Sequence, residues 1–342
     1  MSHKKSTKRS LHALGVLVML LLFGFADTVQ AQRSIIPSLG NSRSGTSGFQ
    51  FLKINPDARS SGLGASNVAD AADASALYLN PALAAQMRGN QIQLGHTQYF
   101  TDISLNYAAY VHRMGSMAFG ASLLYLDSGD INETTEFNPF GTGRTFRAIN
   151  MAAGLTFAQE LTNLFSYGVT FKYVEERIAE FEAQTVVFDV GFFYRVGDTG
   201  LRFAVGLNNF GIDASPSGEV RRLDLNGEIR ETEFEEVSPP TTFKMGAAYD
   251  VFTGDNLSVV GLAQITNPAD NAEQFSLGAE LIYLNQFYLR AGYEFGVDEA
   301  SLPSFGVGFN LPVLNYSLGL DYGFSTRDRL GSLHRFALKF NL

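Results

Sequence analysis

The chain has 342 residues, a formal net charge of −9 and no cysteine. This length allows two ordinary soluble domains or one large β domain. The acidic balance argues against nucleic acid as a partner, and the lack of cysteine excludes disulfides, lipoprotein acylation, a thiol nucleophile and thiolate metal ligands.

The first 31 residues are predicted to be a secretory signal peptide. Basic residues cluster at positions 4–9, an apolar run covers 11–25, and Val29-Gln30-Ala31 offers a small-residue cleavage site. The alternative is an N-terminal membrane anchor, for which the apolar run is short. The next stretch, 32–48, is polar and rich in Ser and Gly, so we expect a flexible or extended segment.

Residues 49–89 form a distinct unit, the hatch, before the regular pattern begins. Asp57 and Arg59 are two positions apart, so in an extended stretch they would share a face and pair with each other or with groups in a lumen. Gly62 and Gly64 permit a tight turn or a close approach of two backbones.

A short helix is expected at the end of the hatch. Asn80 is placed to cap a helix that begins at Pro81, where the missing N–H of proline costs nothing. The residues at 82–87 are good helix formers. The alternative is that 49–89 is a small domain or linker packed outside the main fold.

From Asn90 to the end, apolar and polar residues alternate with period two. The expected strands are 91–99, 102–113, 116–127, 145–157, 165–177, 184–195, 200–210, 241–251, 256–266, 273–283, 286–296, 303–311, 313–324 and 332–342. They form an even set, and most have about the 9–11 residues that cross a bilayer at a tilt. The sequence contains 29 phenylalanines and 14 tyrosines but no tryptophan, so phenylalanine and tyrosine must form any interfacial girdle.

Loop lengths give a second signal. Connections after even-numbered strands are short, whereas several after odd-numbered strands are long, namely 128–144, 178–183, 211–240, 297–302 and 325–331. A transmembrane barrel has short periplasmic turns and long outer loops. A soluble sandwich or propeller, the alternative, has no reason to sort its loops in this way. We therefore expect an all-β transmembrane antiparallel barrel of about 14 strands over 90–342.

The run PDARSSGLGASNVADAADASALYLNPALAA at 56–85 resembles the N-terminal signature of PorV/PorQ-type outer-membrane proteins, which belong to the FadL-like fourteen-stranded barrels. The positions that carry this hatch motif are Asp57, Arg59, Gly62, Gly64, Asp73, Asn80 and Pro81. The resemblance implies a barrel in the outer membrane of a Gram-negative-type bacterium, surrounded by outer-membrane lipid. It also implies that the hatch fills a lumen too wide for side chains alone.

No catalytic or metal-binding pattern stands out. His96, His112 and His334 lie on separate expected strands without metal-ligand spacing. No nucleophile elbow and no phosphate-binding loop is present, so we expect neither a metal nor a cofactor, and an enzymatic barrel ranks last.

The leading functional hypothesis is an accessory or shuttle component of type IX-like protein secretion. The resemblance implies that such barrels accept exported proteins with a C-terminal sorting domain and pass them to attachment machinery at the cell surface. Candidate docking residues in the long loop 211–240 are Arg221, Arg222, Arg230, Glu233 and Glu235. The alternative for this loop is a solvated, mobile segment.

The second hypothesis is a passive transporter of hydrophobic small molecules, because FadL-like barrels bind lipidic ligands beside the hatch. The candidate apolar pocket comprises Phe51, Leu52, Ile54, Leu77, Tyr78 and Leu79. A structural barrel with no assigned role is a third option. The glycines at 206, 261 and 278 would permit either a lateral opening or packing in the lumen.

Overall fold

The computed structural model describes residues 47–71, 73–100, 102–135, 137–217, 221–223, 229–231, 234–297, 302–313, 316–328 and 331–342. These residues belong to one compact unit, 42–342. The expected signal peptide and nearly all of the segment 32–48 lie outside the described residues.

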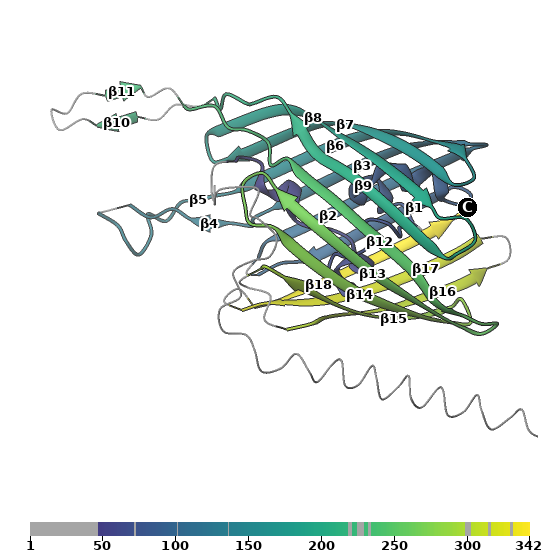
Figure 1. Ribbon diagram of the computed structural model, residues 1–342. Coiled ribbons are helices and arrows are strands. Elements are labelled where there is room, and N and C mark those ends of the chain that lie inside the picture. Colours follow the sequence, from purple (N-terminus) through teal and green to yellow (C-terminus); the bar gives the residue numbers. More distant parts are fainter. Residues whose placement is uncertain are drawn as a thin grey trace, which may run out of the picture. The chain divides into compact units, whose positions relative to one another are not determined.

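Fourteen antiparallel strands in the described part of the chain close into a barrel (Figure 1). They are β1 (Gln91–Gln98), β2 (Ser104–Met114), β3 (Met117–Asp127), β6 (Ala148–Thr162), β7 (Phe165–Ile178), β8 (Phe181–Arg195), β9 (Leu201–Gly211), β12 (Thr242–Thr253), β13 (Leu257–Pro268), β14 (Gln274–Tyr283), β15 (Phe287–Phe295), β16 (Ser304–Val313), β17 (Tyr316–Arg327) and β18 (Gly331–Asn341). Each strand pairs with its neighbour in the chain, and β1 pairs with β18 to complete the ring. The predicted fold class is confirmed.

The alternation in the sequence separates the outside of the wall from the lumen. On β1, Ile92 and Leu94 point outward and are exposed, whereas Gln91 and Gln93 point inward and are buried. Closing the ring satisfies the backbone hydrogen bonds without free edges, which is the condition for a sheet to reside in hydrocarbon. No helix among the described residues is long and apolar enough to cross a membrane.

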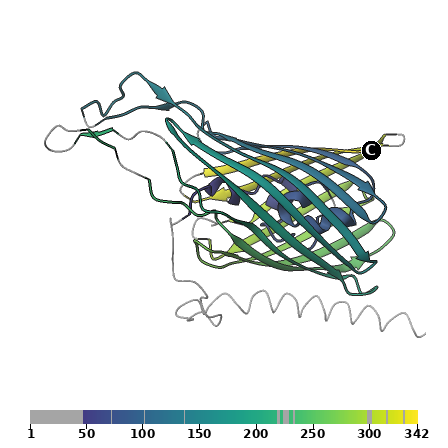
Figure 2. The same ribbon diagram turned by 90° about the horizontal axis from the view of Figure 1, so that it is seen from above.

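The connections sort by length broadly as expected. The short turns at 115–116, 163–164, 254–256 and 284–286 lie at one end of the barrel, which we take as the periplasmic end. The two longest connections lie at the other, outer end, and each carries a hairpin (Figures 1 and 2). One hairpin pairs β4 (Ile131–Asn132) with β5 (Thr145–Phe146), and the other pairs β10 (Arg221–Leu223) with β11 (Ile229–Glu231).

Three expected segment boundaries were wrong. The long loop predicted at 178–183 is a two-residue turn, because the strands continue into it: Glu182 belongs to β8 and pairs with Arg177 on β7, with 3.5 Å between Arg177 Nη2 and Glu182 Oε2. The connection predicted at 325–331 spans only 328–330. The strand predicted at 145–157 is β6, which begins at Ala148, and the two residues at 145–146 belong to β5.

The hatch lies in the lumen in both views (Figures 1 and 2). Its elements are η1 (Gln50–Lys53), α2 (Ala58–Gly62), α3 (Ala76–Leu79) and η2 (Pro81–Gln86). The helix α2 packs on β15 to β18, whereas η2 packs on β6, β7 and β8. Thus the hatch spans the lumen and contacts both sides of the wall.

The two sides of the lumen differ in chemistry. The inner faces of β2, β3 and β6 to β9 contribute buried apolar residues, such as Leu105, Leu124 and Phe193, to a core shared with the hatch. The inner faces of β14 to β18 carry buried charged residues, such as Glu280 and Arg290. The hatch therefore needs one apolar side and one charged side.

Candidate functional site

Glycines of the hatch motif meet glycines of the barrel wall. A Cβ placed on Gly62 would lie 2.7 Å from the Cα of Gly306, and one on Gly64 would lie 2.6 Å from the backbone N of Tyr293. Gly64 also has a φ of 60°, which a residue with a side chain rarely adopts. On the wall, a Cβ at Gly292 would overlap the backbone of Leu63. These glycines let two backbones touch, and they fix where the hatch sits.

Asn80 and Pro81 make the same kind of contact on the opposite wall. The side chain of Asn80 accepts a hydrogen bond from the N–H of Ala82 at 3.0 Å and so caps η2, which is a 3-10 helix. Its Nδ2 atom donates to the carbonyl of Phe192 at 3.3 Å. A Cβ at Gly168 of β7 would lie 2.5 Å from the carbonyl carbon of Pro81.

Asp57 and Arg59 do not pair with each other. The expectation of an extended stretch was wrong, because Asp57 is the N-cap of α2 and accepts the N–H of Ser60 at 2.8 Å. Its other carboxylate oxygen accepts a hydrogen bond from Gln93 Nε2 on β1 at 3.0 Å. The helix turns Arg59 toward a different wall of the barrel.

Arg59 enters a largely buried chain of alternating charges. It donates twice to Glu280, with Nε to Oε1 at 3.0 Å and Nη2 to Oε2 at 2.6 Å, and its Nη2 lies 2.6 Å from Asp70 Oδ2. Arg290 Nε reaches Glu280 Oε1 at 2.6 Å and also pairs with Asp321. In order, the members of the chain are Asp250, Arg202, Asp70, Arg59, Glu280, Arg290, Asp321, Lys339 and Asp73.

The sequence analysis found only Arg59 and Asp73 of this network. It missed Asp70 in the hatch and the six partners on the barrel strands. The sequence does contain a signal for these six residues, because each is a charged residue at an inward position of an alternating strand. An empty lumen would not require charge there, so a charged inward residue indicates a partner inside the barrel. Matching each one to a hatch residue requires the closed ring.

The hatch divides the lumen into two chambers that share no lining residue. The periplasmic chamber, about 430 Å³, is lined by the charge network, including Arg59, Glu280 and Lys339. The outer chamber, also about 430 Å³, reaches the outer loops at Asn271 and Val297. The hatch therefore lies between the two chambers.

The residues predicted to form an apolar pocket are only partly gathered. Leu52, Ile54, Tyr78 and Leu79 line the outer chamber. Leu77 and Phe51 are buried in the apolar core instead, where Leu77 packs against Gly120 of β3. Charged and amide groups complete the outer chamber, so these four residues form only part of a mixed lining.

An ion pair ties the start of the hatch to the outer rim. Asp270, in the loop between β13 and β14, accepts hydrogen bonds from Gln50 Nε2 at 2.7 Å and from Lys53 Nζ at 2.9 Å. Burial alone would raise the pKa of Asp270, but these two hydrogen bonds outweigh burial and hold the pKa below its ordinary value of 3.8. The tie is therefore at full strength above pH 3.8 and weakens as the pH falls through the lowered pKa.

Asp270→Asn is expected to speed hydrogen exchange of the Leu52 and Ile54 amides, which bond within η1. The loss of a charged acceptor costs about 1 kcal/mol, or about five-fold in exchange rate. Mass spectrometry of peptides covering η1 checks this at neutral pH, with Asn271→Ala as the control, because that side chain only accepts its neighbour's N–H. Equal exchange rates in the two variants would contradict the claim that Asp270 holds the start of the hatch at the outer rim.

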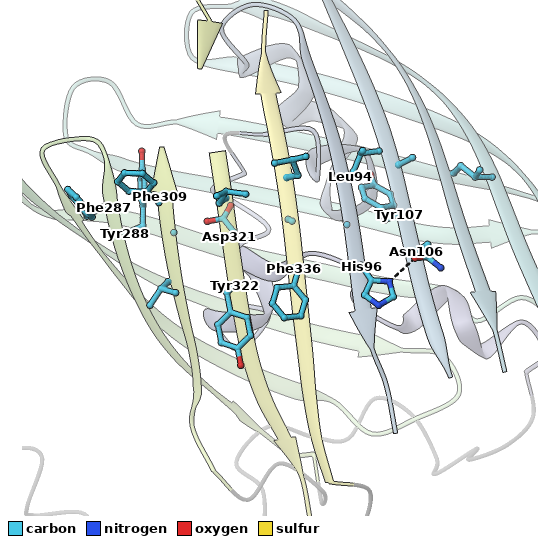
Figure 3. A pocket seen from close by; sticks show the side chains of 18 of the residues that line it. Leu94, His96, Asn106, Tyr107, Phe287, Tyr288, Phe309, Asp321, Tyr322 and Phe336 are labelled. Atoms are coloured by element: carbon cyan, nitrogen blue, oxygen red, sulfur yellow. Dashed lines mark hydrogen bonds between the residues drawn. The ribbon is translucent and has the colours of Figure 1, made fainter. Parts of the chain in front are cut away.

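A groove of about 1110 Å³ lies on the outer, lipid-facing side of β15 to β18 and β1 to β3 (Figure 3). Phe336 and Tyr322 lie side by side on paired strands, with ring centroids 5.2 Å apart. A polar pair, His96 Nδ1 and Asn106 Oδ1 at 2.8 Å, lies beside them. Outward leucine, valine and phenylalanine side chains make the groove part of the membrane-facing band.

The predicted docking residues of the loop 211–240 are only partly described. In the register of the β10–β11 pair, Arg221 is the partner of Glu231, and Arg222 is the partner of Arg230. Glu235 is exposed, and Glu233 lies outside the described residues. Among the residues that the structure describes, no group of three or more His, Cys, Asp or Glu is placed to hold a metal ion.

The closed ring, the lipid-facing band and the hatch define a fourteen-stranded barrel of the Gram-negative outer membrane. The Pseudomonas putida toluene transporter TodX is similar, with a TM-score of 0.58 at 16% sequence identity over 83% of this chain and 96% of that chain. The Ralstonia pickettii toluene transporter TbuX has a TM-score of 0.55 at 14% identity over 86% and 98%. At these identities, the likeness concerns the fold alone.

A search of curated proteins found no match. A family model described as "Type IX secretion system protein PorV" matches residues 38–267, which include the hatch and more than half of the barrel strands. The chain belongs to the PorV family, as the hatch motif indicated.

Proposed function

We propose that the protein is an accessory or shuttle component of type IX-like secretion that binds exported proteins at the cell surface. The observation that carries this proposal is the PorV family membership of a barrel whose lumen is divided by its own hatch. A hatch across the lumen favours a role at the outer rim and on the membrane-facing wall over conduction of a polypeptide. The groove on the lipid-facing side of β15 to β18 and β1 to β3 is then a candidate contact for another membrane component of the same system.

The hairpin of β4 and β5 offers a contact surface for cargo. Arg144 and Glu133, which flank its connecting loop, form an ion pair, with Nε to Oε2 at 2.7 Å and Nη2 to Oε1 at 3.0 Å. Near its tip, Phe137 and Phe140 are 92% and 103% exposed. Burying one phenylalanine is worth about 2 kcal/mol, so a folded hairpin that holds two of them in water favours binding to an apolar partner surface.

Deleting the gene is expected to abolish surface delivery of a reporter that carries a C-terminal sorting domain. Phe137→Ala/Phe140→Ala is expected to lower delivery by about ten-fold or more, since two buried rings contribute several kcal/mol. Protease accessibility of the reporter on whole cells is the measurement. The control, Phe171→Ala/Phe188→Ala, removes two rings in edge-to-face contact from the lipid-facing band and leaves the hairpin intact.

Normal delivery in the deletion strain would rule out the secretion role. Loss of delivery on deletion, with normal delivery by the hairpin variant, would keep the role and exclude the hairpin as the contact. Equal losses in the hairpin variant and the control would attribute the effect to barrel assembly.

The outer chamber favours a second candidate function, passive transport of hydrophobic small molecules. The chamber lies beside the hatch, has Leu52, Ile54 and Leu79 in its lining, and reaches the outer loops. Native mass spectrometry of the protein extracted from outer membrane tests this function. A stoichiometric hydrophobic ligand supports it, and an empty lumen contradicts it.

A further inference from the structure

The outer chamber is positively charged, although the whole chain carries a net charge of −9. Its charged lining residues are Lys53, Lys244, Arg327 and Arg335, against a single Glu294. Lys53 is neutralised by Asp270 at 2.9 Å, and Arg327 by Glu294 at 3.0 Å. Two cations, Lys244 and Arg335, remain without an acidic partner among the described residues.

Lys244 has no protein anion to bind. It lies on the inner face of β12, and within the described part of the chain it makes neither a hydrogen bond nor an ion pair. Its one polar contact is with the ring of Tyr78, whose centroid is 5.2 Å from Nζ. Asp189, two strands away on β8, is already paired with Lys172 at 2.5 Å and accepts the N–H of Asn209 at 2.8 Å.

Arg335 increases the positive charge and is held in place by neutral groups. Its Nε donates to the carbonyl of Asn55 at 2.8 Å, and its Nη1 donates to Ser61 Oγ at 2.8 Å and to Ser325 Oγ at 3.0 Å. Its exposed fraction is 4%. A buried guanidinium with only neutral acceptors leaves an uncompensated charge at the hatch side of the chamber.

We propose that the outer chamber binds a small organic acid, with its carboxylate on Lys244 and its apolar or aromatic body on Tyr78, Leu79 and Leu52. The chamber volume, about 430 Å³, lies within the range of small-molecule sites. An anion compensates the desolvated ammonium, which a neutral hydrocarbon cannot do. The proposal concerns binding alone, so it does not depend on the secretion role, and it is narrower than transport of hydrophobic molecules.

The test compares two probes of one shape, 4-phenylbutyrate and 4-phenyl-1-butanol, by isothermal titration calorimetry on the purified full-length barrel in nanodiscs. The wild-type protein is expected to bind the acid about ten-fold more tightly than the alcohol, because only the acid forms a charge-assisted hydrogen bond. Lys244→Met is expected to remove this preference: the affinity for the acid falls about ten-fold, whereas the affinity for the alcohol changes by less than about two-fold. Lys244→Arg, which keeps the charge, is expected to retain the preference.

The control is Arg177→Met, which removes one positive charge from an exposed position at the outer end of β7. It is expected to leave both affinities unchanged. Equal binding of acid and alcohol by the wild-type protein, or an equal loss of acid binding in the Arg177 and Lys244 variants, would overturn the proposal. Because Lys244 supports no contact with a protein anion, melting temperatures of its variants are expected to match the wild type, so a loss of acid binding reports the site.

Discussion

Gly292→Ala is expected to displace the hatch and to destabilise the protein by about 3 kcal/mol or more. The added Cβ overlaps the backbone of Leu63, which is fully buried. Backbone atoms cannot rotate away as a flexible side chain can, so either the strand or the hatch has to move. Two measurements check this result: chemical unfolding of the reconstituted barrel, and single-channel conductance, which rises when the hatch no longer separates the two chambers.

Gly206→Ala is the matched control. Gly206 also faces the lumen, on β9, but its added Cβ would have no neighbour closer than 3.5 Å. There the substitution is expected to be neutral or to stabilise by up to about 1 kcal/mol, because alanine restricts the unfolded chain. If both variants lose stability alike, the fit between the hatch and the wall glycines is not what holds the hatch.

Glu280→Gln is expected to cost about 3 to 5 kcal/mol. The carboxylate is 1% exposed and receives hydrogen bonds from both Arg59 and Arg290. The amide has the same shape but no charge, so two guanidinium groups stay buried and repel each other across one site. Unfolding monitored by circular dichroism, together with proteolysis of the hatch, measures the loss.

Glu294→Gln is the control for Glu280→Gln, since Glu294 has a single partner, Arg327, in a more exposed setting. Its expected cost is about 1 kcal/mol or less. The double variant Arg59→Met/Glu280→Met should recover much of the stability, because the remaining pairs, Arg202 with Asp70 and Arg290 with Asp321, stay matched. A double variant no better than Glu280→Gln would contradict the network account.

The wall could be predicted because each of its residues faces either lipid or lumen. On β17, Leu320 faces outward and Asp321 inward, and this alternation is visible in sequence without knowledge of any neighbour. The strand ends were predicted less well because charged residues were assigned to loops, as at Glu182, whose pairing with Arg177 of β7 shows that β8 begins earlier than expected.

The hatch could be predicted only where its structure is local. Asn80 caps η2 through the N–H of a residue two positions on, and that pattern is readable in the motif. Arg59, in contrast, bonds to Glu280, 221 residues away, and the wall glycines that receive the hatch lie on strands far along the chain. Such partners depend on the order in which fourteen strands close, which period-two alternation does not specify.

The contacts of β18 bear on how the protein is assembled. This last strand carries Arg335 and Lys339, which bond to Ser61 and Asp73 of the hatch, and it pairs with β1, which directly follows the hatch. The same strand therefore completes the wall and contacts the hatch. We expect the hatch to enter the lumen before β18 pairs with β1 during assembly. Closure of the barrel by the final strand would then depend on a filled interior.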